Sequence, residues 1–532
     1  MWAKNWREQI WSDLDQPWDL LIIGGGITGA GILREASRAG LKALLVEGRD
    51  FASGSSSRSS KMVHGGLRYL SYAQIKVTVD SVRERERLLR EGRGLIEPLG
   101  FFIAGYRGDR PPSWVFGFAL IIYDLLGRKW AHQHHTRRRM KELCPLITET
   151  KLLGGYHYYD AQTDDARLVL RVIREAVRAG GRAINYAVVE GLMRDRSGQV
   201  RGVHLRDHIT GQTKEVLAPA VISATGAWAD GLRAQLGAPR KLRPLRGSHL
   251  IFPWRNLPLT QAVSFLHPID HRPVFAYPWQ GITLVGTTDV DHGTGLRDDP
   301  RISAQELDYL FIGIQHAFKP ANLSVSDVQV TFSGIRPVVD TGRADPSKES
   351  RESVLWDERG LITVTGGKLT TFRLMALGAL RAARSRIPHR PRLDAKQPIL
   401  DPVETSLPAH VDPGAAMRLL GRYGADAPEL VKAAKPNELE AINGSTAMWA
   451  ELRWAARDEG VVHLDDLLLR RVRLGLLLPQ GGLQWMDRIR AIAQPELGWN
   501  DEKWAKEVEG YTRLWNQCYG EPDEPRPHPR DR

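Results

Sequence analysis

The segment Gly24-Gly25-Gly26-Ile27-Thr28-Gly29 has the residue types and spacing that bind a pyrophosphate, and it directly follows the apolar run 20–23. Gly24 permits the tight turn, Gly26 lets the backbone approach the phosphates, and Gly29 lets the next helix pack on the strand. The N–H groups at the start of that helix and its dipole attract the phosphates. Glu47 follows a second apolar run, 43–46, and would accept hydrogen bonds from a ribose. The pattern predicts a dinucleotide-binding βαβ unit, and the acid at position 47 disfavours NADP.

The loop after Glu47 favours FAD over NAD. Residues 50–69 are rich in serine and glycine, which supply many short donors along the pyrophosphate and ribityl chain of a long cofactor. NAD needs no such segment. The alternative is a flexible linker, because Ser/Gly runs usually are linkers. However, Lys61, His64, Arg68 and Tyr69 are poor linker residues, so we expect the loop to line a flavin site.

Two segments, 22–31 and 56–69, resemble the FAD-dependent glycerol-3-phosphate dehydrogenases of the respiratory, aerobic type. Further matches follow in the family's order: Asp164-Asp-Ala-Arg-Leu168, Ala224-Thr-Gly-Ala-Trp228, Arg246-Gly-Ser-His249, Gly286-Thr-Thr-Asp289, Ser333-Gly-Ile-Arg-Pro337 and Gly366-Gly-Lys-Leu-Thr-Thr371. Residues 422–424 and 453–473 are similar to the family's helical C-terminal domain. The resemblance is therefore nearly full length.

The resemblance implies that the chain binds FAD and oxidises sn-glycerol 3-phosphate to dihydroxyacetone phosphate. Together with the glycine turn and the serine loop, it assigns cofactor binding to Gly24, Gly26, Ile27, Thr28, Gly29, Glu47, Ser56, Ser59, Ser60, His64, Gly65, Gly66, Val188, Thr225, Gly226, Gly366, Gly367, Lys368, Leu369 and Thr370.

A site for glycerol 3-phosphate needs cations, because the substrate is a small dianion. Arginine matches a phosphate as a fork and lysine as a point charge. The resemblance carries substrate binding onto Arg68, Tyr69, Arg336 and Lys368, and each of the three cations lies in a glycine-bearing motif. Asp289 and Asp340 are alternative partners for these cations.

Oxidation at C2 sends a hydride to the flavin while a base accepts the hydroxyl proton. We expect His249 to be that base or to polarise the developing carbonyl, because imidazole titrates near working pH. The expected catalytic set is His249, Arg336 and Lys368, with His64 the second candidate for the base. His132, His134 and His135 lack an accompanying acid or cysteine pattern, so we predict no metal.

Three functions remain open at this level. The favoured one passes electrons from FAD to a membrane quinone. The second is an oxidase of the same substrate that uses oxygen; the family oxidases carry an insert for which there is no room between Arg336 and Lys368. The third is a non-catalytic or tRNA-modifying flavoprotein, which the intact set of cations disfavours.

The 532 residues carry a net charge of +12, which fits contact with anionic lipid. The apolar run 114–126 is too short to span a bilayer, but its aromatic residues and flanking arginines suit a helix in the headgroup plane, an ordinary buried helix being the alternative.

We expect a cytoplasmic protein, peripherally attached to the inner face of the cell membrane, with a homodimer left open. Two distant cysteines and an N-terminus without an apolar core agree with that compartment. No motif for reading nucleic acid is present, so no nucleic-acid partner is expected.

The predicted architecture is α/β. A Rossmann-like FAD-binding domain is built from about residues 18–100, 155–245 and 330–385, within an oxidoreductase region of 18–385. An antiparallel-sheet substrate domain, similar to that of D-amino-acid oxidase, takes about 100–155 and 245–330. A linker at 386–402 leads to a helical C-terminal domain at 403–520, and the Pro-rich tail 521–532 is expected to be disordered.

Overall fold

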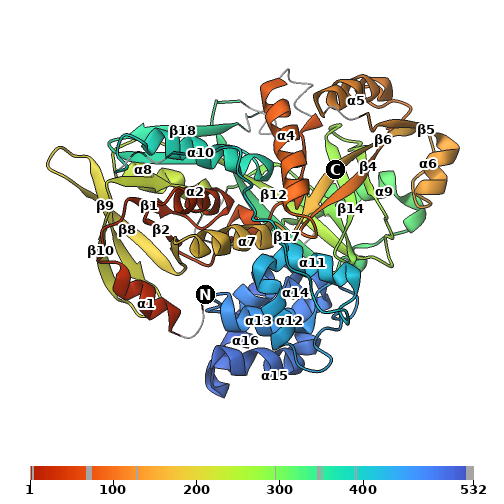
Figure 1. The fold of residues 1–532 in the computed structure, drawn as a ribbon. Helices are drawn as coiled ribbons and strands as arrows, with labels where there is room; N and C mark the ends of the chain where they lie inside the picture. The colour runs from red at the N-terminus through yellow and green to blue at the C-terminus, as the bar shows by residue number, and fades with distance from the viewer. Residues whose placement is uncertain are drawn as a thin grey trace.

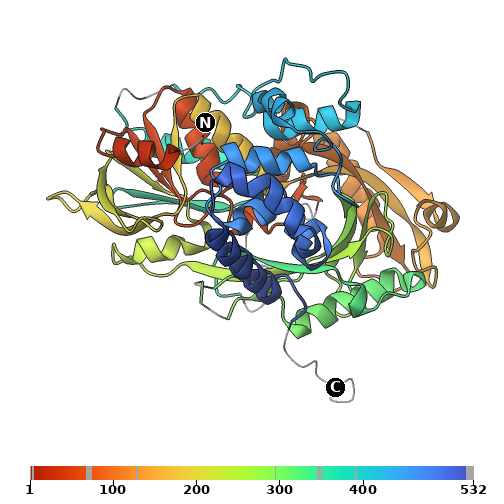
Figure 2. The ribbon, with the colours of Figure 1, turned by 90° about the horizontal axis from the view of Figure 1, so that it is seen from below.

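The computed structural model describes residues 2, 5–67, 75–127, 130–293, 295–296, 298–343, 349, 352–388, 390 and 392–522. Figure 1 shows two sheet-containing parts side by side, with the C-terminal helices below them in blue. Seen from below, these helices lie across the junction between the two parts (Figure 2). The predicted fold class, a Rossmann-like domain with a mainly antiparallel second sheet and a helical C-terminal region, is confirmed.

The first sheet is the predicted nucleotide-binding sheet. Its strand order is β18 (Ser353–Glu358), β19 (Leu361–Gly366), β11 (Ala220–Ser223), β1 (Leu20–Ile23), β2 (Ala43–Val46) and β7 (Arg182–Ile184). All neighbours are parallel except the β18–β19 hairpin. The four residues of β1 are 5% exposed or less, because both faces of the sheet are covered.

Each face of this sheet has its own cover. On one face α2 (Ile27–Arg38) packs between α7 (Asp165–Arg178) and α10 (Phe372–Ala383). The other face meets α1 (Trp6–Asp13) and an antiparallel sheet of β8 (Ala187–Arg194), β9 (Val200–Asp207) and β10 (Thr213–Leu217). Residues 183–189 are divided between β7 and β8.

Over the residues that the structure describes, the second sheet has ten strands, and it lies across the cavity from the nucleotide-binding sheet. Its main order is β16 (Val290–Asp291), β12 (Leu242–Pro253), β15 (Ile282–Gly286), β14 (Pro273–Trp279), β13 (Ala262–Leu266), β4 (Ile96–Tyr106), β6 (Leu152–Thr163) and β3 (Met62–Val63). β17 (Val330–Val339) pairs with β12, and β5 (Gln133–Thr136) pairs with β6. The β4–β13 pair is parallel and the others are antiparallel. The expected antiparallel sheet is thus present, with one parallel pair of strands.

Helices cover both faces of the second sheet. α9 (Ala304–Ala317) and α6 (Arg137–Leu143) lie on one face. α4 (Ile75–Glu91) and α5 (Ser113–Gly127) pack against β4 and β6 of this sheet. A short helix of the first part, α8 (Ala229–Ala234), follows β11 in the chain. Four C-terminal helices share a core with the other face: α13 (Trp449–Asp458), α14 (Leu474–Leu477), α15 (Met486–Leu497) and α16 (Asp501–Cys518). α11 (Pro413–Tyr423) and α12 (Ala427–Ala433) pack with α13 in a separate hydrophobic cluster.

The segment predicted as a linker, 386–402, is packed onto the protein where it is described. Arg87 of α4 donates to the carbonyls of Ala395 at 3.1 Å and Gln397 at 2.7 Å. Ile399 is fully buried. Residues 523–532, most of the predicted disordered tail, lie outside the described residues.

Candidate active site

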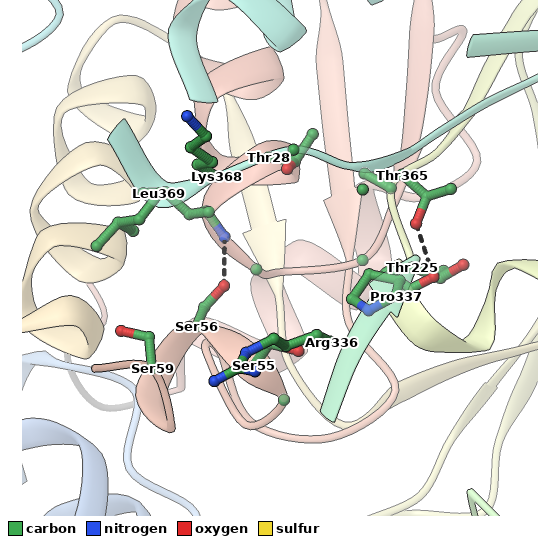
Figure 3. Close-up of a pocket in the computed structure, with 18 of the residues that line it drawn as sticks. Thr28, Ser55, Ser56, Ser59, Thr225, Arg336, Pro337, Thr365, Lys368 and Leu369 are labelled. Carbon is green, nitrogen blue, oxygen red and sulfur yellow. Dashed lines mark hydrogen bonds between the residues drawn. The ribbon is translucent and has the colours of Figure 1, made fainter. Parts of the chain in front are cut away.

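A cavity of about 880 Å³ lies between the two sheets. Its walls include the carboxyl ends of β1, β2, β11 and β19, the usual place for a ligand in a doubly wound sheet. The volume lies toward the upper end of the range for small-molecule and cofactor sites, which suits a ligand as long as a dinucleotide. Figure 3 shows residues from the serine loop, β17 and the 365–369 segment around the same space.

Two of the motif glycines are required by packing. Gly24 has φ +112°, and a Cβ there would lie 2.6 Å from the Ala224 carbonyl oxygen on the neighbouring strand. A Cβ on Gly29 would lie 1.9 Å from the carbonyl oxygen of Gly24. Larger residues would push the turn, the strand and the helix apart.

Gly26 serves the cavity instead. Its φ of −79° is open to any residue, and a Cβ there would point at Ser56 Oγ, 3.1 Å away across the cavity wall. α2 begins at the next residue, so its N-terminal N–H groups face this space. The bare backbone therefore leaves room for a phosphate at this point of the cavity.

Glu47 lines the cavity at the end of β2. Its carboxylate accepts N–H groups of Gly25 at 2.6 Å and Arg49 at 2.8 Å. Burial raises the pKa of Glu47, while these two hydrogen bonds act in the opposite direction. A carboxylate held in this way can still accept hydrogen bonds from a ribose through its remaining lone pairs.

The serine loop lies along the other side of the glycine turn. Ser56 Oγ accepts the N–H of Ile27 at 3.0 Å, the dashed line near Ser56 in Figure 3. Ser59 Oγ donates to Asp165 at 2.7 Å, and Ser60 Oγ shares a 2.8 Å hydrogen bond with His249 Nε2. The loop is thus anchored at three points, in contrast to a flexible linker.

Most of the predicted cofactor residues line the cavity. They are Gly24, Gly26, Ile27, Thr28, Glu47, Ser56, Ser59, Ser60, His64, Gly66, Val188, Thr225, Gly226, Gly366, Gly367, Lys368, Leu369 and Thr370. Gly29 lies behind Gly24, and Gly65 donates its N–H to Asp160 at 3.1 Å. Arg68 and Tyr69 lie outside the described residues.

The other two predicted substrate cations share the cavity. Arg336, on β17, donates to Asp289 Oδ1 at 2.8 Å and to Thr287 Oγ1 at 3.0 Å. Lys368, after β19, donates to Ser81 Oγ of α4 at 3.1 Å. Asp289 is thus a partner of Arg336, one of the alternatives that the sequence left open.

His249 is buried behind the cavity wall and reaches it through Ser60. Its ring stacks on Phe332, with ring centres 4.6 Å apart. Burial lowers the pKa of His249 well below its usual value, and the charges of Arg336 and Lys61 lower it further. The imidazole is therefore neutral at working pH, as a proton acceptor must be, but it is a weak base.

Sequence reasoning missed several residues of this site. Arg272 lines the cavity and contacts the second oxygen of Asp289 at 3.3 Å. Phe101, Tyr158 and Phe275 form an aromatic wall, with Phe101 and Tyr158 stacked at 5.2 Å. Arg272 lies just before β14 and the three aromatic residues lie in strands, so none of them belongs to a local motif that could have indicated its role.

The donor set of the cavity fits FAD. The glycine turn and the N-terminus of α2 suit the pyrophosphate, Glu47 suits the adenosine ribose, and the serine loop supplies short donors along the remaining chain.

Two family models cover the chain. Residues 19–384 match the model described as FAD dependent oxidoreductase, and residues 379–504 match the C-terminal domain of alpha-glycerophosphate oxidase.

Individual proteins agree with these models. The aerobic glycerol-3-phosphate dehydrogenase of Staphylococcus saprophyticus is 32% identical over 535 residues, which cover 95% of each chain. The FAD complex of a glycerol-3-phosphate dehydrogenase from Bacillus halodurans is similar in structure, with a TM-score of 0.80, 26% identity and coverage of 99% of this chain and 100% of the other. An L-alpha-glycerophosphate oxidase from Mycoplasma pneumoniae shares the fold, with a TM-score of 0.58, 18% identity and coverage of 73% and 98%. The chain belongs to the family of FAD-dependent aerobic glycerol-3-phosphate dehydrogenases.

Proposed function

We propose that the protein oxidises sn-glycerol 3-phosphate to dihydroxyacetone phosphate and passes the electrons to a membrane quinone. The observation that carries the proposal is that Arg336 and Lys368 line the same cavity as the glycine turn and Glu47. A dianionic substrate and a dinucleotide would then occupy adjoining parts of one site. The names of the Staphylococcus and Bacillus relatives support the same substrate.

Arg336 is the residue best placed to hold the substrate. Asp289 and Thr287 fix its guanidinium from one side, so its orientation is set before the substrate arrives. The fixed fork would bind the phosphate or the developing carbonyl oxygen, with Lys368 as a second charge. FAD, when bound, accepts the hydride from C2.

The hydroxyl proton needs an acceptor, and Ser60 together with His249 offers one. Ser60 Oγ lines the cavity and can pass a proton to Nε2 of the neutral imidazole through their 2.8 Å hydrogen bond. His249 itself does not line the cavity, so it would act through Ser60.

Two features favour a quinone over oxygen as electron acceptor. Met62, Leu67, Phe101, Tyr158 and Phe275 give the cavity an apolar side that suits a quinone ring. The segment from Arg336 to Lys368 also has no room for the insert of the family oxidases. An oxidase remains the second candidate, because the C-terminal family model is named for one.

An anaerobic flavin assay tests both parts of the proposal. Addition of glycerol 3-phosphate is expected to bleach the bound flavin, and a short-chain quinone analogue is then expected to restore its colour faster than air-saturated buffer does. Failure to bleach would reject the substrate. Equally fast reoxidation by oxygen would identify an oxidase.

The proposal also places the protein on the cytoplasmic face of the cell membrane, with α5 in contact with lipid. Four apolar residues of α5 share a strongly exposed face: Trp114 at 68%, Phe118 at 63%, Ile121 at 37% and Leu125 at 66%. Exposed Arg107 and Arg110 lie just before the helix. Among the described residues, no helix has the length and apolarity needed to cross a bilayer. An exposed apolar face with cationic flanks supports peripheral binding in the headgroup plane.

Cosedimentation with anionic vesicles tests this contact. The double change Trp114→Ser and Phe118→Ser is expected to weaken vesicle binding about tenfold or more, since burying one such side chain contributes ~1.5–3 kcal/mol. High salt is expected to release part of the wild type. Leu217→Ser, which changes a 59% exposed residue on β10, is the control and should bind like wild type. Equal binding by all three proteins would reject α5 as the lipid-binding helix.

A further inference from the structure

The serine loop is held by a part of the chain that does not line the cavity. We define the flavin loop as residues 50–61, which follow β2 in the chain and end immediately before β3. Its cavity-lining members include Ser56, Ser59 and Ser60. Asp50 at the start of the flavin loop and Ser57 in its middle contact buried arginines from residues 470–473 of the helical C-terminal domain.

Asp50 fixes the first end of the loop. Its side chain has no exposed surface, and it accepts Arg471 NH1 at 2.6 Å, Arg471 NH2 at 2.8 Å and Arg470 Nε at 2.5 Å. Burial alone would raise the pKa of Asp50, but the two guanidiniums outweigh it and hold the pKa well below its usual range. Asp50 is thus a charged anchor whose partners lie more than 400 positions away in the sequence.

Arg473 fixes the middle of the loop and, through Asp165, its last residues. Its NH2 donates to the carbonyl oxygen of Ser57 at 2.8 Å and to Asp165 Oδ1 at 3.1 Å. Asp165 also accepts the N–H and the hydroxyl of Ser59 and the ammonium of Lys61. Arg473 therefore touches the middle of the flavin loop directly and its last residues through one carboxylate.

Two properties of Arg473 indicate a specific role. Its side chain is fully buried, and the Ser57 carbonyl and Asp165 supply acceptors for its guanidinium there. Its backbone has φ +68° and ψ +11°, a left-handed conformation uncommon for residues other than glycine. This strained backbone conformation occurs at the residue whose side chain reaches the flavin loop. We expect the surrounding contacts of Arg473 to stabilise it.

We infer that the C-terminal domain is part of the FAD-binding apparatus, with Arg471 and Arg473 as positioning residues that hold the flavin loop in the shape that binds FAD. The inference rests on the assignment of Ser56, Ser59 and Ser60 to FAD made above. A loop ordered in advance binds its ligand more tightly, because less conformational freedom is lost on binding. FAD affinity thus depends on residues that do not line the cavity.

FAD titration of the apo-protein tests the inference. Arg473→Met is expected to raise the Kd for FAD at least about tenfold, the effect of losing ~1.4 kcal/mol. Arg453→Met is the matched control, because Arg453 is also buried but pairs with Glu438 and Glu496 inside the C-terminal domain. Its Kd should stay near that of the wild type even if its thermal stability falls.

Limited trypsin digestion of the same apo-proteins gives a second readout. Arg58 and Lys61 are buried cleavage sites in the flavin loop, and Arg473→Met should expose them while Arg453→Met should not. If Arg473→Met does not fold, Arg473→Lys is measured by the same criteria, since it keeps a charge beside Asp165 but loses the fork that also reaches Ser57.

Two results would overturn the inference. One is a wild-type Kd and a protected loop in the Arg473 variant. The other is an equal loss of affinity in the Arg453 control, which would mean that both arginines only support the fold. Failure of the FAD-site assignment is distinguishable, because FAD binding would then also survive Gly26→Val.

Discussion

Gly26→Val protein is expected to purify without flavin colour. Gly26 has an unstrained φ of −79°, so valine can adopt its backbone conformation. Its Cβ would point into the cavity toward Ser56 Oγ, 3.1 Å away, and its methyl groups would fill the space assigned to the pyrophosphate. The turn can therefore still form while its ligand is excluded. Visible absorbance of the purified protein, together with far-UV circular dichroism, measures the two effects separately.

Gly378→Val is the matched control. Gly378 lies in α10, does not line the cavity, and has no heavy atom within 4 Å of an added Cβ. It should stay yellow. A folded Gly26→Val protein that keeps its flavin would show that the pyrophosphate lies elsewhere.

Local signals explain why the nucleotide-binding half could be predicted. An apolar strand, a glycine turn and a helix follow one another in residues 20–38, so this unit can be recognised from one continuous stretch of sequence. The strand that precedes Thr225 is likewise a continuous apolar run. The parallel pairing of β1 with β11 then brings Thr225 beside the glycine turn. α7 also begins at a local signal, because Asp164 is its N-cap and accepts the N–H of Arg167.

The rest of the site depends on contacts between distant segments. Nothing near Arg336 in the sequence shows that Asp289 fixes it, because the two meet only when β17 and the end of β15 lie together across β12. The aromatic wall likewise combines β4, β6 and β14. The arginines at 471 and 473 resemble an ordinary charged helix in sequence, yet both are fully buried against the flavin loop.

Exposure is the other property that the sequence left open. The run 114–126 was compatible with a buried helix or with a lipid-facing one. In the structure Leu120 and Tyr123 are buried, and Tyr123 donates to Asp160 at 2.7 Å, while Trp114, Phe118 and Leu125 are exposed. Only the position of α5 at the edge of the second sheet decides which face of the helix meets solvent (Figure 1).

Arg336→Met is expected to lower kcat/KM for glycerol 3-phosphate about 10-fold to 150-fold, while the flavin content hardly changes. The loss of a charged hydrogen bond costs roughly 1.5 to 3 kcal/mol, which corresponds to that range. Methionine keeps most of the packing of the arginine stem. Asp289 keeps a cationic neighbour, because Arg272 contacts its other oxygen at 3.3 Å. The folding penalty of an unpaired buried carboxylate is thereby reduced, and steady-state kinetics with a quinone analogue should report mainly the loss of substrate contact.

Arg246→Met is the matched control. It shows whether the loss of kcat/KM in Arg336→Met comes from a lost substrate contact or from the loss of any buried ion pair near the site. Arg246 lies on β12 beside β17 and pairs with the buried Glu306 at 2.7 Å, but it does not line the cavity. Its kcat/KM should stay within about threefold of wild type, a change below ~1 kcal/mol. Plain glycerol, which lacks the phosphate, should be a very poor substrate for the wild type. If Arg336→Met instead kept normal kcat/KM but lost FAD, Arg336 would be a cofactor residue, and Lys368 would have to hold the substrate without it.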